Sequence, residues 1–148
     1  MQGLGNDFIV IDDVSREEGR TKINADIVKK ICDRRFGVGA DQLLVILPTS
    51  GADAEMKVFN ADGTGAEMCG NGVRAVAIYL RDHGPSPKKN QYKVLTGMGL
   101  LTLKIEKDLV TVNMGVPDWK GTQTLTIEGQ EMSFSEVSTG NPHAVFFV

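Results

Sequence analysis

Residues 60–74 read Asn60-Ala-Asp-Gly-Thr-Gly-Ala-Glu-Met-Cys69-Gly-Asn-Gly-Val-Arg74, a glycine-rich thiol segment that runs directly into an apolar-periodic stretch. From Val73 onward, apolar residues recur three, four and seven positions apart, which predicts an amphipathic helix lying on a core. They are Val73, Val76, Ala77 and Leu80. Cys69 is therefore expected directly before the first turn of this helix.

A helix start gives a cysteine particular chemistry. The unsatisfied backbone N–H groups and the positive end of the macrodipole favour negative charge, which predicts a Cys69 thiol shifted toward thiolate and an anion bound beside it. Gly70 and Gly72 have no Cβ, so we expect a ligand to approach the backbone closely there. The alternative interpretation of Cys69 is a small buried hydrophobe. Polar and glycine residues flank it on both sides, whereas Cys32, one turn after Val28 in a predicted helix over 25–35, fits that core role.

Bulk properties narrow the class of protein. The chain has 148 residues, of which 41% are hydrophobic, enough for a packed core. The net charge is −3 and no basic run exceeds Lys88-Lys89, which argues against nucleic acid as a partner. No apolar stretch approaches the roughly 18 to 20 residues of a membrane span, and the N-terminus lacks a signal-peptide layout. We therefore expect no membrane association and a cytoplasmic location.

The cysteine and histidine inventory argues against disulfides and metals. Two cysteines in dissimilar segments do not make a disulfide framework, which agrees with a reducing compartment. His83 and His143 lie far apart and have no cysteine at metal-ligand spacing. No metal site is expected.

Periodicity and turn residues predict the remaining elements. Besides the two helices, the second of which should end near Asp82, the expected strands cover 8–11, 43–47, 54–60, 92–96, 100–106, 109–114, 125–127, 132–137 and 144–148. The pattern breaks at 115–118, which predicts a boundary between a first domain, 1–114, and the start of a second, 115–148. Because the last apolar run has no polar end, we expect a chain cut within a strand.

Four further segments combine small, amide and glycine residues. They are 3–7, 37–42, 60–63 and 138–143. Asparagine and glutamine amides offer both donors and acceptors without charge, which suits recognition of a zwitterionic substrate. Taken singly, each segment is more typical of a turn than of a ligand site.

In this order, the five segments resemble the diaminopimelate epimerase family, with matching stretches at 3–8, 35–44, 59–74 and 138–143. The resemblance implies an α+β fold of two similar domains, each a β-sheet wrapped around a central helix, with the substrate between them. It implies interconversion of LL- and meso-diaminopimelate in bacterial and plant lysine synthesis. One thiolate removes the α-proton and a second thiol returns one to the opposite face, with neither cofactor nor metal.

The resemblance also implies roles for particular residues. Cys69 is the acid/base thiol, and Gly70 and Asn71 hold the reacting carboxylate. Asn6, Asn60 and Asn141 contact the polar ends of the substrate, and Gln42 lies near the reaction centre. His143 matches a position that tunes thiol ionisation; its alternative is a histidine satisfied in a turn after Pro142. An α-C–H is a very weak acid, so fixed dipoles in a dry site must stabilise the carbanion.

The sequence departs from the family pattern in three places. The second cysteine, in an Ala-Cys-Gly-Thr-Gly segment preceded by Glu-Arg, has no counterpart, and Cys32 belongs to the wrong segment to replace it. A short strand that precedes the family's first motif is also missing, and Ala75 stands where many relatives carry another cysteine. We therefore expect this chain to be a fragment that is inactive alone. A homodimer is an open alternative for its full-length parent. The alternatives are a proline racemase-like isomerase of the same architecture and a non-catalytic polypeptide.

Overall fold

The computed structural model describes residues 1–14, 22–139 and 142–147. The chain divides into two compact units, Met1–Asn113 and Met114–Val148. The first combines two helices with a mixed sheet, and the second contains strands only in its described part. The predicted α+β class is confirmed.

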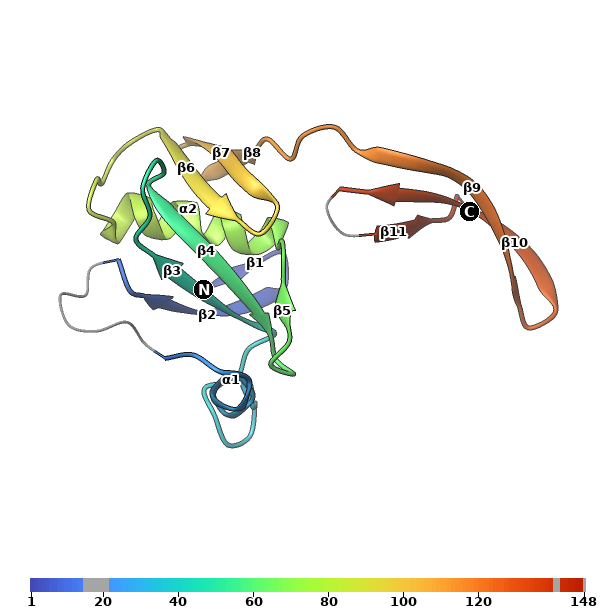
Figure 1. Cartoon of the computed structure of the whole chain (residues 1–148), viewed down its shortest axis with the longest axis horizontal. Helices are drawn as coiled ribbons and strands as arrows, with labels where there is room; N and C mark the ends of the chain where they lie inside the picture. Colours follow the sequence, from blue (N-terminus) through green and yellow to red (C-terminus); the bar gives the residue numbers. More distant parts are fainter. Residues whose placement is uncertain (15–21, 140–141, 148) are drawn as a thin grey trace. The chain divides into compact units, whose positions relative to one another are not determined.

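The first unit is a sheet curled around a helix (Figure 1). Its strand order is β1-β2-β3-β4-β6-β7-β8, with β5 paired to β4. Helix α2 (Gly70–His83) contacts β1 and β2 at one end of the sheet and β6, β7 and β8 at the other, so it is the central helix that the family resemblance implied. The strands are β1 (Gln2–Gly3), β2 (Asn6–Asp12), β3 (Gln42–Leu47), β4 (Ala54–Asn60), β5 (Gly65–Ala66), β6 (Gln91–Thr96), β7 (Gly99–Glu106) and β8 (Leu109–Val112).

The apolar stripe of α2 forms the core of this unit. The four periodic residues predicted to face inward are at most 2% exposed: Val73, Val76, Ala77 and Leu80. The helix ends at His83, one residue beyond the expected Asp82, and the Gly84 N–H bonds the Leu80 carbonyl at 3.0 Å. The predicted amphipathic helix is confirmed.

Strand β3 is covered on both faces. Leu43, Val45 and Leu47 pack against Val28 and Cys32 of α1 (Ala25–Cys32). Leu44, on the opposite face, lies against α2 at Gly72. This double burial explains the continuous apolar run, and it confirms Cys32 as a core residue, 3% exposed. Neither helix of the described residues has the length and apolarity to cross a membrane.

Three sequence predictions in this unit need correction. Helix α1 ends at Cys32 rather than Arg35, because the Asp33 backbone is extended and its carboxylate accepts the N–H groups of Arg35 and Phe36, both at 2.7 Å. Strands β1 and β5 were not predicted, since two residues are too few to show a period. Strand β8 ends at Val112, before the expected 114.

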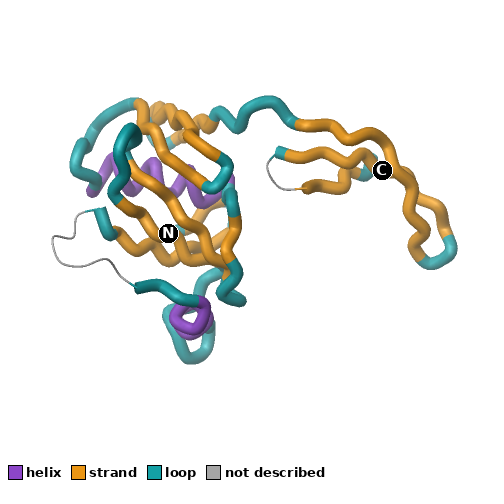
Figure 2. The backbone as a smooth tube through the Cα atoms, in the orientation of Figure 1, coloured by secondary structure: helices purple, strands orange, loops and turns teal. Residues whose placement is uncertain are grey.

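The second unit is an antiparallel sheet in the order β11-β10-β9, drawn in orange in Figure 2. Its strands are β9 (Asp118–Ile127), β10 (Gln130–Ser138) and β11 (Pro142–Val145). Strand β9 starts within the segment expected to be a break and is far longer than the predicted 125–127, while β11 ends before the predicted 148. Strand β9 pairs with β10 along almost its whole length. This pairing makes it a strand although most of its residues are polar.

Candidate active site at the start of helix α2

Cys69 is the N-cap of α2, as the sequence predicts. Its backbone is extended, and its Sγ atom accepts the Gly72 N–H at 3.2 Å. The thiol is free and half-buried. Met68 is buried directly before it, and a Cβ on Gly97 would lie 2.9 Å from the Glu67 Cα, so packed neighbours fix the approach of the chain. The N–H groups of Gly70 and Asn71 belong to the first turn, which has no intrahelical acceptors for them.

The two glycines after Cys69 have different roles. A Cβ on Gly70 would meet nothing within 4 Å, so its backbone is open to a ligand. A Cβ on Gly72 would lie 3.1 Å from Leu44 Cδ2 and 3.2 Å from Cys69 Sγ. The prediction that Gly72 admits a ligand is therefore wrong: it lets α2 pack closely on β3.

Three predicted substrate-binding amides gather at one edge of the sheet. Gln42 pairs with Phe8 of β2 and with Asn60 of β4. Asn6 precedes Phe8 by two residues and so lies on the same face. Leu44, two residues after Gln42, contacts the start of α2. All three amides therefore lie on the face of the sheet that carries α2.

The direction of α2 brings its N-terminus to this same edge. At its start, the Asn71 backbone lies 3.4 Å from the position of a Cβ on Gly3, which pairs with Asn6. Further along, the Tyr79 hydroxyl donates to Asp12 at the end of β2, at 3.1 Å. The helix thus runs parallel to β2 and β3. Its positive end faces the sheet edge formed by Asn6, Gln42 and Asn60, which we call the amide edge.

The hydrogen bonds of the amides are unevenly satisfied. The Gln42 Nε2 group donates to Asn60 Oδ1 at 2.9 Å, and Asn60 Nδ2 donates to Thr64 Oγ1 at 3.0 Å. Gln42 Oε1 is buried without a donor among the described residues. The Asn71 Oδ1 atom accepts from Arg74, one turn along α2. In the described part of the chain, one acceptor, Gln42 Oε1, is therefore left free on the face of the sheet that carries α2.

The remaining two predicted site residues belong to the second unit. His143 is exposed in β11, where its Nε2 lies 3.3 Å from Thr139 Oγ1. It stands in a strand rather than in the turn that was its alternative. Asn141 lies outside the described residues. The structure thus brings together Cys69, Gly70, Asn71, Asn6, Gln42 and Asn60.

An ion-pair cluster behind the amide edge was not predicted. The Arg34 guanidinium donates to both Asp7 oxygens at 2.7 and 2.8 Å and to Asp41 at 2.7 Å. Asp7 and Asp41 directly adjoin Asn6 and Gln42, but successive strand residues face opposite sides, so this cluster lies on the α1 side. Arg34 holds the pKa of the Asp7 carboxyl well below its usual range. Asp7 and Asp41 are 34 residues apart, so the cluster forms only when β2 pairs with β3, and no local pattern reveals it.

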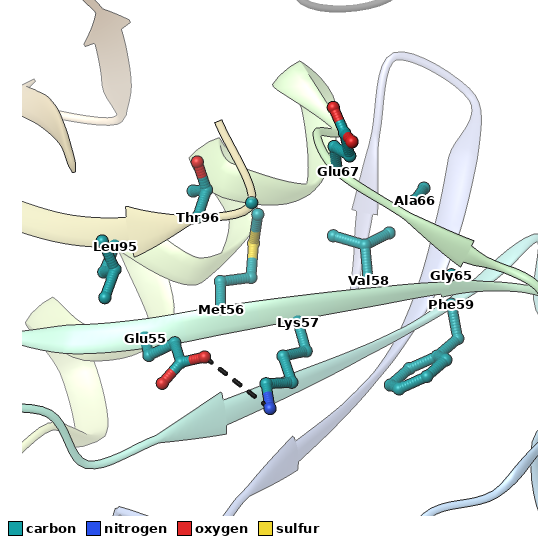
Figure 3. A pocket seen from close by; sticks show the side chains of 11 residues that line it. Glu55, Met56, Lys57, Val58, Phe59, Gly65, Ala66, Glu67, Leu95 and Thr96 are labelled. Carbon is teal, nitrogen blue, oxygen red and sulfur yellow. Dashed lines mark ion pairs between the residues drawn. The ribbon is translucent and has the colours of Figure 1, made fainter. Parts of the chain in front are cut away.

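Figure 3 shows a pocket of about 420 Å³ that lies outside the amide edge. It opens where β4 leaves β6 after Glu55 and turns to pair with β5. Glu55 and Lys57 form an ion pair on one side of β4, and Met56 and Val58 extend from the other (Figure 3). None of the predicted site residues lines it.

Comparison with known proteins identifies close relatives. The sequence model of the family described as diaminopimelate epimerase matches residues 1–120. The chain is 42% identical to the diaminopimelate epimerase of Carboxydothermus hydrogenoformans and 41% identical to that of Desulfitobacterium hafniense. Each alignment covers 100% of this chain and 58% of the relative. The chain therefore spans a little over half the length of these curated relatives.

Solved structures share the fold at much lower identity. A hydroxyproline epimerase from Agrobacterium vitis matches with a TM-score of 0.66 at 17% identity, over 80% of this chain and 38% of that one. A predicted epimerase from Pseudomonas aeruginosa matches with a TM-score of 0.67 at 14% identity, over 97% of this chain and 54% of that one. At these identities the likeness concerns the architecture alone.

Proposed function

The chain belongs to the diaminopimelate epimerase family, an isomerase family, and we propose that its amide edge and the start of α2 form one half of the site that interconverts LL- and meso-diaminopimelate. In this proposal Cys69 exchanges a proton with the α-carbon on one face. A thiol on the opposite face, outside these 148 residues, exchanges a proton on the other. The product enters lysine biosynthesis.

The observation that carries this proposal is the placement of the Cys69 thiol. It caps α2 beside the free N–H groups of Gly70 and Asn71, at the sheet edge that gathers Asn6, Gln42 and Asn60. A carboxylate held by the helix start would draw the electron pair of the carbanion toward fixed dipoles. The thiolate takes the α-hydrogen as a proton, and the carbanion takes a proton from the opposite thiol, so the configuration inverts.

Cys32 does not fit the second thiol. It packs in the cluster between α1 and β3, on the face of the sheet opposite to α2. Asn141 and His143 stay proposed members of the site. We also propose a cytoplasmic location, which the two free thiols support, and a homodimer for the complete enzyme.

Turnover by the complete gene product tests the proposal. In deuterated water, LL-diaminopimelate should convert to the meso form with deuterium at the inverted carbon, and Cys69→Ser should lower kcat by at least about a hundredfold, as loss of a general acid/base requires. Proline serves as the competing substrate. Turnover of proline alone, or a fully active Cys69→Ser enzyme, would exclude this function.

A further inference from the structure

We propose that Asp62 and Thr64 are positioning residues that set the direction of a hydrogen-bond chain through Asn60, so that Gln42 presents its carbonyl oxygen to an ammonium group of the substrate. This inference rests on the proposed function. It adds two residues of the β4–β5 turn to the machinery of the site, and it assigns the amino end of the substrate to the Gln42 side.

The chain of hydrogen bonds starts at the Asp62 carboxylate. An ionised carboxylate only accepts hydrogen bonds. Thr64 directs both its backbone N–H, at 2.9 Å, and its hydroxyl, at 2.5 Å, to Asp62 Oδ1. These bonds lower the pKa of Asp62 and keep it ionised at neutral pH. The single hydroxyl proton of Thr64 is therefore committed to Asp62.

Because the Thr64 hydroxyl donates its proton to Asp62, the orientations of the Asn60 and Gln42 side-chain amides are fixed. Thr64 Oγ1 has only lone pairs left, so the group that faces it at 3.0 Å must be the Asn60 NH2. The Asn60 carbonyl oxygen then points the other way and accepts the Gln42 NH2 at 2.9 Å. Gln42 Oε1 remains as the free end, buried and without a donor among the described residues.

A buried acceptor at this position selects the group that it meets. Leaving it unsatisfied costs about 1 to 3 kcal/mol, which an incoming N–H donor recovers. A carboxylate would place lone pairs against lone pairs. The first turn of α2 prefers the carboxylate instead. An amino acid would thus lie with its ammonium toward Gln42 and its carboxylate toward Gly70 and Asn71, which presents one face of the α-carbon to Cys69.

Thr64→Val and Thr64→Ser form a matched pair to test this. Valine keeps the shape but removes the hydroxyl, so the two amides lose their fixed direction; serine keeps the hydroxyl. Thr64 is exposed, so neither change should impair folding, which thermal melting checks. In the 148-residue chain, the side-chain amide NMR signals of Gln42 and Asn60 should shift in Thr64→Val and stay near their wild-type positions in Thr64→Ser.

Binding to the complete protein gives the second measurement. Thr64→Val should weaken the binding of LL-diaminopimelate about tenfold, which is the cost of one unmatched hydrogen bond. It should leave pimelate, which has the carboxylates but no ammonium groups, unchanged. Equal weakening of both ligands, a Thr64→Ser variant that behaves like valine, or unmoved amide signals would each overturn the inference. If the wild-type protein bound no diaminopimelate, the proposed function would fail, and the amide signals would still decide the hydrogen-bond chain.

Discussion

The two cysteines differ in the surroundings that decide thiol reactivity. Cys69 is half-buried at a helix start, whereas Cys32 is 3% exposed and burial raises the pKa of its thiol. We expect brief treatment of the native chain with iodoacetamide to modify Cys69 about tenfold faster or more, since Cys32 must wait for its core to open. Mass spectrometry of the peptides measures both rates. Faster labelling of Cys32 would contradict the assignment of Cys69 as the reactive thiol.

The glycines on either side of Asn71 give a second contrast at the residue scale. Gly72→Ala would press a methyl group against Leu44 and the Cys69 sulfur, so we expect a loss of about 1 to 3 kcal/mol in the free energy of unfolding. Gly70→Ala, into open space, should cause no loss. Urea titration of the two variants compares them. Equal stability would show that α2 moves freely over β3.

At the scale of elements, the Arg34 cluster ties the start of β2 to the start of β3. Without the guanidinium, the Asp7 and Asp41 carboxylates would repel one another across the two strands. We predict that Arg34→Gln lowers the urea midpoint at pH 7 more than Arg35→Gln does. Both changes remove one positive charge from the same loop, but Arg35 forms no ion pair within the described residues.

The pH dependence of this difference follows from the lowered pKa of Asp7. A carboxyl with a lower pKa in the folded state stabilises the fold above its unfolded value of about 3.9 and loses that effect as pH falls below it. The difference in urea midpoint between the wild type and Arg34→Gln should therefore be constant from pH 7 to about 5 and shrink in stronger acid. A gap that widens in acid would assign the effect to another group.

Elements with a clear period were predictable from the sequence, and contacts between distant residues were not. The repeat from Val73 to Leu80 predicted α2, and the apolar run 43–47 predicted β3. The motifs from 3 to 74 predicted the family, which the relatives confirm. The long β9 was not predicted because residues 120–124 carry no apolar side chain. The Arg34 cluster was not predicted because it forms only when β2 pairs with β3.

The candidate site was predictable as a set of residues but not as a geometry. Motifs named Asn6, Gln42 and Asn60, and only strand register shows that they share a face and an edge. Asp62-Gly63, within the segment 60–63, was recognised as typical of a turn, and Thr64 follows it directly. Its hydroxyl orients the amides only because β4 returns beside β3, which a local pattern does not reveal.

At the scale of the whole molecule, the two units differ in the core that supports them. In the first, α2 and β3 bury large side chains completely. In the described part of the second, 114–139 and 142–147, no side chain is fully buried. Trp119 is 66% exposed and Val116 is 93% exposed. A small sheet without a buried core is marginally stable in water.

Hydrogen exchange should reveal this difference along the chain. Amides of β9, β10 and β11 have ladder bonds but no fully buried side chain to support them. Local opening should therefore expose them at least about a hundredfold more often than amides of α2 and β3, whose opening would also uncover a buried core. Mass spectrometry of peptides from the labelled monomeric chain measures both sets. A dilution series is the control, because pairing between exposed strands of two copies would slow exchange only at high concentration. Equal protection of both units at every concentration would contradict this prediction. It would mean that contacts other than ladder hydrogen bonds stabilise the second unit, and that the exposed apolar residues of this unit do not govern its stability.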